Sequence, residues 1–229
     1  MPLRPHHNKD IVQQVELMRP DVNPFAGEFV SMLTDRSTPV FDSKSACENK
    51  GSWHQSAVKR FDKLVVEIGS HYGRVLSDFA KDHPETLVVG MEITFKRVVK
   101  STKKAQSLGL QNVRCMLANA REFKNFFSPE EIDGVIIFFP DPWPKIRHEK
   151  NRLLNESFCQ ELYSCLAPDA FVWFKTDFKP YFEVASLALH NAGFRMSNDQ
   201  KPETWNYTSI FEDRFQQQGL ERYEGFWKK

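Results

Sequence analysis

The sequence has few cysteines, and none of them has the spacing of a metal site. Its four cysteines form no CxxC pair, and none lies near a histidine at zinc-finger spacing. We therefore expect thiols of a reducing compartment and no metal. No apolar run approaches the roughly 18 residues that span a bilayer, and the first residues lack the apolar core of a secretory signal. These absences favour a cytoplasmic protein with no membrane contact.

Positively and negatively charged residues are nearly equal in number. The chain of 229 residues has 31 Lys and Arg against 30 Asp and Glu, which gives a net charge of +1. A polybasic or polyacidic tail protein is therefore excluded. Disorder is also excluded, because hydrophobic residues make up 41% and aromatic residues 13% of the sequence. A chain of this length supports one sizeable core, so we expect one domain over residues 61–229.

Residues 1–60 differ from the rest of the chain in composition and periodicity, and they predict a partly irregular N-terminal arm. They show little periodicity and contain five prolines, Pro2, Pro5, Pro20, Pro24 and Pro39. Such an arm either packs on the main body or becomes ordered on a partner. Basic residues near its start suggest an RNA-facing arm, although a docked or disordered tail explains them equally well: Arg4, His6, His7 and Lys9.

From residue 63 onward, short apolar runs alternate with helical patterns. Five buried strands are expected at 63–69, 86–92, 112–118, 132–140 and 170–177, and strand-like pieces follow at 194–197 and 222–227. Helices are expected at 73–84, 95–108, 155–166 and 179–191. This alternation predicts an α/β fold with a mostly parallel, seven-stranded sheet covered by helices on both faces. Ligands of such sheets bind at the carboxyl ends of the strands.

The turn after the first strand has a glycine at each end, Gly69 and Gly73, which permits a tight turn and close approach of a ligand. The middle glycine of a GxGxG loop is absent, and His71 takes its place. Taken alone, this is a weak nucleotide-binding signal, and an ordinary strand-to-helix turn explains it as well.

Acidic residues at two strand ends narrow the choice of ligand. Glu92 ends the second strand about twenty residues past the loop, where a carboxylate suits a ribose diol. Glu67 lies beside the glycine loop, where it disfavours a pyrophosphate and favours a cation. S-adenosylmethionine fits, because it carries a sulfonium and an ammonium but no phosphate. Asn119, followed by Ala120 after the third strand, either pairs with an adenine edge or caps a helix.

The segment after the fourth strand carries the strongest signal. It reads Phe-Phe-Pro-Asp-Pro-Trp, with Asp141 held between two prolines. A basic cluster follows, comprising Lys145, Arg147, His148, Lys150 and Arg152. A rigid carboxylate beside a stacking ring and phosphate-binding cations suits a flipped base on a polyanion. The alternative is a surface loop with solvated charges.

Two further features are less specific. Asp177 ends the fifth strand, where it either faces the same pocket or caps the next helix. The helix after Glu92 has a basic face formed by Lys96, Lys100 and Lys103, which is explained by solvation or by contact with an RNA backbone.

The string Phe-Phe-Pro-Asp-Pro-Trp-x-Lys-x-Arg-His, placed after a fourth buried strand, resembles the bacterial tRNA (guanine-N7-)-methyltransferase family, usually called TrmB. The similarity runs from about Leu64 to the end of the chain. Glu67-Ile68-Gly69, Gly90-Met91-Glu92, Asn119-Ala120 and Lys175-Thr176-Asp177 resemble its successive motifs. Ser209-Ile210-Phe211-Glu212 resembles its C-terminal Thr-x-(Phe/Tyr)-Glu element.

This resemblance implies a Rossmann-like class I methyltransferase that uses S-adenosyl-L-methionine to methylate the variable-loop guanine at position 46 of tRNA. The implied catalytic residue is Asp141. The implied cofactor positions are Glu67, Gly69, Gly73, Glu92, Asn119, Ala120 and Asp141. The implied substrate positions are Lys145, Arg147, Asp177, Ser209, Ile210, Phe211 and Glu212, and Arg152 is expected to hold phosphate as well.

The chain departs from the family pattern at three positions: His71 replaces the middle loop glycine, Pro144 a histidine, and Ser209 a threonine. Two alternatives therefore stay open. One is a non-catalytic tRNA-binding relative that has lost the cofactor at the His71 loop. The other is an amino-group nucleic-acid methyltransferase, whose acid- or Asn-Pro-Pro-aromatic motif is superficially similar. We expect a monomer or a homodimer.

Overall fold

A computed structural model of the chain describes residues 23–35, 37–55 and 61–229. The basic residues suggested to face RNA, Arg4, His6, His7 and Lys9, lie outside this range. Within it, no helix is long and apolar enough to cross a membrane.

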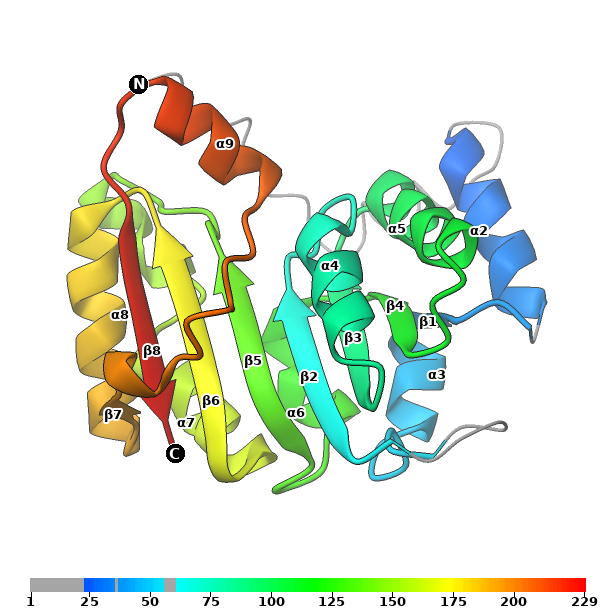
Figure 1. Ribbon diagram of the computed structural model, residues 1–229, viewed down its shortest axis with the longest axis horizontal. Helices are drawn as coiled ribbons and strands as arrows, with labels where there is room; N and C mark the ends of the chain where they lie inside the picture. The colour runs from blue at the N-terminus through cyan, green and yellow to red at the C-terminus, as the bar shows by residue number, and fades with distance from the viewer. Residues whose placement is uncertain (1–22, 36, 56–60) are drawn as a thin grey trace.

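The structure is built on one sheet of eight strands in the order β1-β4-β3-β2-β5-β6-β8-β7 (Figure 1). All pairings from β1 to β6 are parallel, whereas β8 runs antiparallel to both β6 and β7. The chain moves outward from β2 to β4 and then returns to add β5 on the other side of β2. The strands are β1 (Val40–Asp42), β2 (Lys63–Ile68), β3 (Thr86–Glu92), β4 (Val113–Leu117), β5 (Ile132–Phe138), β6 (Leu166–Thr176), β7 (Arg195–Met196) and β8 (Tyr223–Lys228).

Helices cover both faces of the sheet (Figure 1). Residues of α2 (Pro24–Thr34), α4 (Arg74–Asp82) and α5 (Phe95–Ser107) pack into one apolar cluster. Residues of α3 (Ser43–Glu48), α6 (Phe123–Phe126), α7 (Glu156–Cys165) and α8 (Lys179–Ala192) pack into the other. The helix α9 (Ile210–Gln217) lies across the carboxyl ends of the strands, and the short 3-10 elements are η1 (Ala120–Glu122), η2 (Ile146–Asn151) and η3 (Asn198–Gln200).

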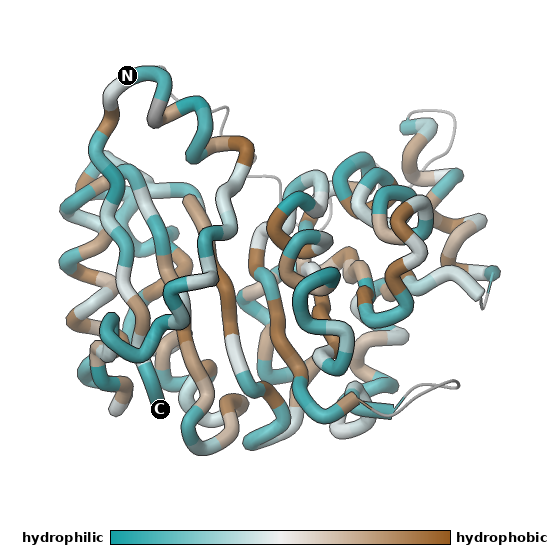
Figure 2. The backbone as a smooth tube through the Cα atoms, in the orientation of Figure 1, coloured by the Kyte–Doolittle hydropathy of each residue, from teal (hydrophilic) through white to brown (hydrophobic). Residues whose placement is uncertain are grey.

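The central strands consist largely of apolar residues, as Figure 2 shows along β2 and β5. Successive residues of β2 alternate between the two clusters: Leu64 and Val66 join one, and Val65 joins the other. Burial of both faces explains why these strands read as solid apolar runs rather than as alternating ones. The predicted fold class, a mostly parallel sheet between two helical layers, is confirmed.

The sheet has eight strands rather than the seven expected, because the N-terminal region supplies β1. This strand of three residues pairs with β4, from Val40 opposite Cys115 to Asp42 opposite Leu117. The preceding α2 packs on α5, where the rings of Phe29 and Phe95 lie 5.4 Å apart. The described part of the predicted arm therefore packs on the main body, which was one of the two expected outcomes.

The same packing explains the basic face of α5. Lys103 pairs with Glu28 of α2, and Lys96 Nζ lies 5.6 Å from the ring centre of Phe25. Lys100 Nζ lies 5.5 Å from the ring of Tyr72. These lysines are exposed, but each has a partner within the chain. Packing against α2 and the glycine loop is therefore one role of these lysines, and contact with an RNA backbone stays a prediction.

Replacement of Gly134 by alanine in β5 should destabilise the fold. The added Cβ would lie 2.1 Å from Cε1 of Phe171, whose ring stacks on Phe226 at 5.3 Å. Overpacking of a core of this kind costs about 1 to 3 kcal/mol. Urea unfolding of the variant should show this loss, and an unchanged midpoint would contradict the packing described here.

Candidate active site

A cleft of about 440 Å³ opens at the carboxyl edge of the sheet. It is lined by the ends of β2, β3, β4 and β5, which flank the position where the strand order reverses. Open α/β sheets bind their ligands at this position. The structure brings together there six of the predicted site residues: Gly69, Glu92, Asn119, Ala120, Asp141 and Phe211.

Glu92 presents a buried carboxylate at the end of β3, with 4% of its surface exposed. Its oxygens accept hydrogen bonds from the N–H of Ile93 at 2.9 Å and of His71 at 3.2 Å, and Arg97 Nη1 lies 3.3 Å away. Burial raises the pKa of Glu92, and Arg97 opposes that rise. The carboxylate is thus fixed in orientation at the place expected to accept the hydroxyls of a ribose.

The loop after β2 makes the tight turn that its glycines predict. Gly69 and Gly73 adopt left-handed conformations with φ of 79° and 68°. A Cβ at Gly73 would also lie 3.0 Å from Cβ of Ser101 in α5. His71 is left-handed as well, with φ of 50°, although it carries a full side chain. The backbone therefore keeps the conformation that favours glycine at the middle position, at a strain cost to histidine.

The ring of His71 lies edge-on to Phe211 of α9, with ring centres 5.0 Å apart. Its Nδ1 is buried, and no partner for it exists among the described residues. Burial, together with the nearby cations Arg97 and Arg214, lowers the pKa of His71 to about 4. His71 is therefore a neutral imidazole at neutral pH.

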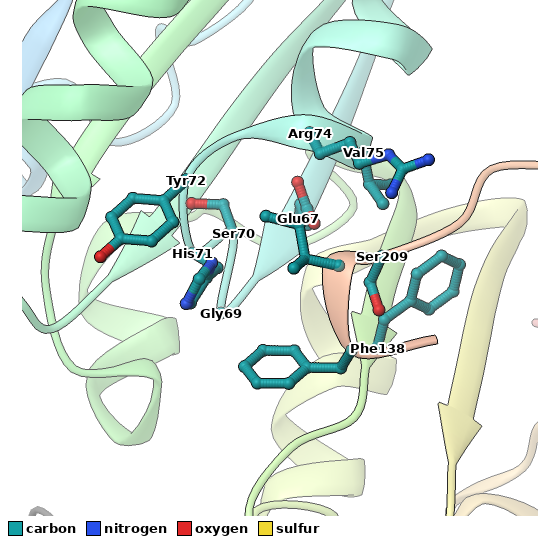
Figure 3. Close-up of a pocket in the computed structure, with 11 residues that line it drawn as sticks. Glu67, Gly69, Ser70, His71, Tyr72, Arg74, Val75, Phe138 and Ser209 are labelled. Atoms are coloured by element: carbon teal, nitrogen blue, oxygen red, sulfur yellow. The ribbon is translucent and has the colours of Figure 1, made fainter. Parts of the chain in front are cut away.

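A smaller hollow lies beside the cleft and contains Glu67 (Figure 3). Burial raises the pKa of Glu67 to about 8, and its Oε2 has no hydrogen-bond partner among the described residues. Four residues line both spaces and thus form their shared boundary: Gly69, His71, Phe138 and Phe211. Ser209 and Ile210 line the small hollow from the start of α9. The histidine that replaces the family glycine stands in the wall between the predicted acid and the main cleft.

The loop after β5 contributes Asp141, which is exposed at the cleft. Phe139 and Trp143, on either side of it, have left-handed φ values of 52° and 43°. Five described non-glycine residues have a positive φ, and three of them, His71, Phe139 and Trp143, line this one cleft. Backbone strain of this kind gathers at functional sites, where surrounding contacts hold it in place.

The expected phosphate contact of Arg152 is wrong. Its side chain is 2% exposed, and its Nε donates to the carbonyl of Pro142 at 3.0 Å. The guanidinium also lies over the rings of Phe178 and Tyr181, at 5.7 and 5.4 Å. Arg152 binds the protein itself and is not available to an RNA backbone.

Lys145 and Arg147 are exposed around the start of η2 and line neither space. Asp177 is partly buried just after β6 and also lines neither. Gly73, a predicted cofactor position, is the N-cap of α4 and also lines neither space. The structure therefore brings the other predicted cofactor residues to one edge and leaves Lys145, Arg147 and Asp177 outside the two spaces.

The Ser209–Glu212 stretch forms the first turn of α9. Ser209 Oγ accepts a hydrogen bond from the N–H of Glu212 at 3.1 Å, and the Glu212 carboxylate reaches back to the N–H of Ser209 at 3.4 Å. This pattern is a capping box. Glu212 is buried and also pairs with Lys175 at 3.2 Å and with Arg222 at 2.7 Å. Its carboxylate is thus engaged in holding α9 onto β6 and β8.

Asn119 fulfils the capping interpretation, because its Oδ1 accepts from the N–H of Arg121 at 3.0 Å at the start of η1. It also lines the cleft. Sequence reasoning missed the lining residues Arg97, Phe138 and Arg214. Arg97 could have been predicted from its spacing, because it lies five residues after Glu92 on the next helix. Arg214 could not, because its position depends on how α9 folds back toward the cleft.

The open, mostly parallel sheet and the family model that matches this chain together define a Rossmann-like class I methyltransferase. The 16S rRNA methyltransferase KamB has a similar solved structure, with a TM-score of 0.57 and 14% identity over 73% of this chain and 88% of that one. A family model described as "Putative methyltransferase" matches residues 62–225.

Curated relatives narrow the class further. The tRNA (guanine-N(7)-)-methyltransferase of Lacticaseibacillus casei is 32% identical over 76% of this chain and 84% of its own length. That of Lactiplantibacillus plantarum is 34% identical over 69% and 73%. The chain belongs to the tRNA (guanine-N7-)-methyltransferase family, as the resemblance predicted.

The site fits S-adenosyl-L-methionine, the cofactor of this class. The unpartnered oxygen of Glu67 is a buried acceptor suited to a cationic group, and the fixed carboxylate of Glu92 suits a ribose. Gly69 brings the backbone close to the cleft without a side chain. We assign the cofactor contacts to these residues and to Asn119, Ala120 and Asp141 as a proposal.

Proposed function

We propose that this chain transfers a methyl group from S-adenosyl-L-methionine to N7 of the variable-loop guanine of tRNA. The observation that carries the proposal is the rigid, strained Asp141 loop at the mouth of an acid-lined cleft. The names of the curated relatives support the same reaction. Because tRNA is the proposed substrate, we also propose the cytoplasm as the compartment and a monomer or homodimer as the working form.

Methyl transfer to guanine N7 depends mainly on how the protein positions the methyl donor and the base. Guanine N7 has a lone pair and no proton to lose, so the protein needs no strong general base. When bound, the cofactor supplies an electrophilic methyl group on a sulfonium. Glu67 and Glu92 hold the donor, and Asp141 stands where donor and base meet. When the protein holds both reactants in the correct geometry, this alignment supplies a large part of the rate enhancement.

Positive charge moves into the purine as the methyl group is transferred. A carboxylate that accepts from guanine N1–H and the exocyclic amine would stabilise this charge and orient the ring. Sequence reasoning left Asp177 and Glu212 as candidates for this clamp. Glu212 is paired with two cations, so we propose it as the anchor of α9. We propose Asp177 as the clamp because it follows the carboxyl end of β6, at the same edge of the sheet as Asp141.

The direct test incubates the pure protein with unmodified tRNA and labelled cofactor, followed by mass spectrometry of the nucleosides. We expect 7-methylguanosine. Methylated adenine or cytosine would instead indicate an amino-group methyltransferase. No transfer, together with no heat of cofactor binding in calorimetry, would indicate a non-catalytic tRNA-binding relative whose His71 loop excludes the cofactor.

Lys145 should contribute to tRNA binding and not to chemistry. Replacing it with alanine removes one exposed cation near the cleft, so the tRNA KM should rise several-fold with little change in kcat. The slope of log affinity against log salt should become shallower by about one. The matched control is Lys44→Ala, an exposed lysine on α3, which lines neither space. A KM unchanged at every salt concentration would argue against the phosphate contact.

A further inference from the structure

Arg152 is a buried charge at the edge of the proposed active site. Only 2% of its side chain is exposed, although it follows the exposed basic residues of η2. Burying a guanidinium is costly unless hydrogen bonds and charges compensate. The contacts of Arg152 therefore indicate which part of the structure this buried charge stabilises.

Those contacts converge on the loop that carries Asp141. Arg152 Nε donates to the carbonyl of Pro142 at 3.0 Å, and Nη2 donates to that of Trp143 at 3.4 Å. Nη1 lies 3.1 Å from a carboxylate oxygen of Glu149, which supplies a counter-charge from the same loop. The planar guanidinium thus binds two successive carbonyls with a fixed geometry that a lysine could not reproduce.

The two carbonyls flank the strained backbone of Trp143. With a φ of 43°, Trp143 is a bulky residue in the left-handed region, a strained conformation that persists only when its surroundings fix it. Arg152 supplies such fixing contacts on both sides of the Trp143 N–Cα bond. Without them, the segment loses two of the contacts that hold it, since the ring contact of Trp143 with His148 at 5.7 Å does not fix these carbonyls, and it relaxes toward ordinary backbone angles and carries Asp141 with it.

The other side of the guanidinium faces the segment after β6. Its centre lies 5.7 Å from the ring of Phe178, the residue after Asp177, and 5.4 Å from that of Tyr181 in α8. The Tyr181 hydroxyl in turn accepts a hydrogen bond from the N–H of Leu154 at 3.0 Å. One side chain therefore spans the Asp141 loop and the Asp177 segment, which come from different strands.

We propose that Arg152 is a positioning residue that holds the Asp141 loop in its strained form and sets its place relative to Asp177. The expected fall in kcat rests on the proposed methyl transfer. The expected change in the conformation of the Asp141 loop does not depend on that reaction. Loss of Arg152 misplaces Asp141 and Asp177 and lowers kcat, while the exposed lysines keep their positions and tRNA binding changes little.

The test compares Arg152→Met with a matched control, Arg121→Met. Arg121 is exposed, and its Nη2 donates to the carbonyl of Asn151 at 2.8 Å, so the control removes a guanidinium–carbonyl contact from the same loop. We expect at least a tenfold fall in kcat for Arg152→Met, with the tRNA KM within threefold of wild type. Arg121→Met should keep kcat within twofold.

Fluorine NMR of protein labelled with 5-fluorotryptophan supplies a readout that does not depend on activity. The Trp143 resonance, assigned from its loss in Trp143→Phe, should move or broaden in Arg152→Met, and that of the buried Trp53 should stay in place. If Arg152→Met does not fold, Arg152→Lys is judged by the same criteria, because lysine keeps the charge but lacks the planar fork.

A wild-type kcat in the variant, or a fall in kcat with an unmoved Trp143 resonance, would overturn the inference. If wild-type protein does not methylate tRNA, the proposed function fails instead, and the Trp143 resonance still decides the positioning role.

Discussion

Replacing Asp141 with alanine should reduce methyl transfer at least a hundredfold and leave the fold intact. Asp141 is exposed at the cleft, between two prolines, so its removal deletes a carboxylate without opening a cavity in the core. Loss of one preorganised electrostatic contact costs about 3 kcal/mol in comparable sites. Transfer of labelled methyl groups to unmodified tRNA measures the rate, and thermal unfolding measures stability.

The control for this variant is Asp62→Ala. Asp62 is also exposed but precedes β2, at the opposite edge of the sheet from the cleft. It should keep full activity. Asp141→Asn separates charge from size: if the charge matters, it should be nearly as inactive as the alanine variant. Full activity of Asp141→Ala would refute the assignment of this residue.

Replacing Glu67 with glutamine should stabilise the protein and weaken cofactor binding at the same time. Burial raises the pKa of Glu67 from 4.5 to about 8. Above pH 4.5 the unfolded chain has lost this proton while the folded chain keeps it, so wild-type stability falls as pH rises toward 8. Glutamine removes this pH-dependent loss, and the gain at pH 7 should be on the order of 2 to 3 kcal/mol.

Urea unfolding at pH 5, 6, 7 and 8 tests this pattern. The advantage of Glu67→Gln over wild type should grow with pH across the series, whereas Glu48→Gln, an exposed glutamate on α3, should show no trend. Calorimetry should show at least a tenfold weaker affinity for the cofactor, because Glu67 can release its proton when a cationic group binds beside it, whereas an amide cannot become negatively charged. A stability difference independent of pH would contradict the buried, protonated state of Glu67.

The sequence predicted the parts of the site that depend on strands. Glu67, Glu92 and Asp141 follow or end apolar runs, and parallel strands bring their carboxyl ends to one edge. The prolines around Asp141 indicated a rigid loop. The order of apolar runs and acids along the chain therefore predicts acids at this edge of the sheet. Glu92 and Asp141 line the cleft and Glu67 lies in the hollow beside it, whereas the roles assigned to them stay predictions.

The parts that sequence reasoning missed depend on contacts distant along the chain. β1 has only three residues and owes its existence to pairing with β4, so no local periodicity indicates it. Arg152 belongs to a run of surface cations, and only the fold turns it inward. Glu212 meets Lys175 from a remote strand; the capping motif alone does not indicate that its charge is engaged.

The antiparallel insertion of β8 between β6 and β7 has a consequence for biosynthesis. α9, which bears Phe211 against the cleft wall, is held to the sheet by ion pairs to Lys175 of β6 and to Arg222, the residue before β8. Translation therefore delivers the rest of the sheet first, and a nascent chain closes this wall only once β8 has emerged from the ribosome and docked beside β6.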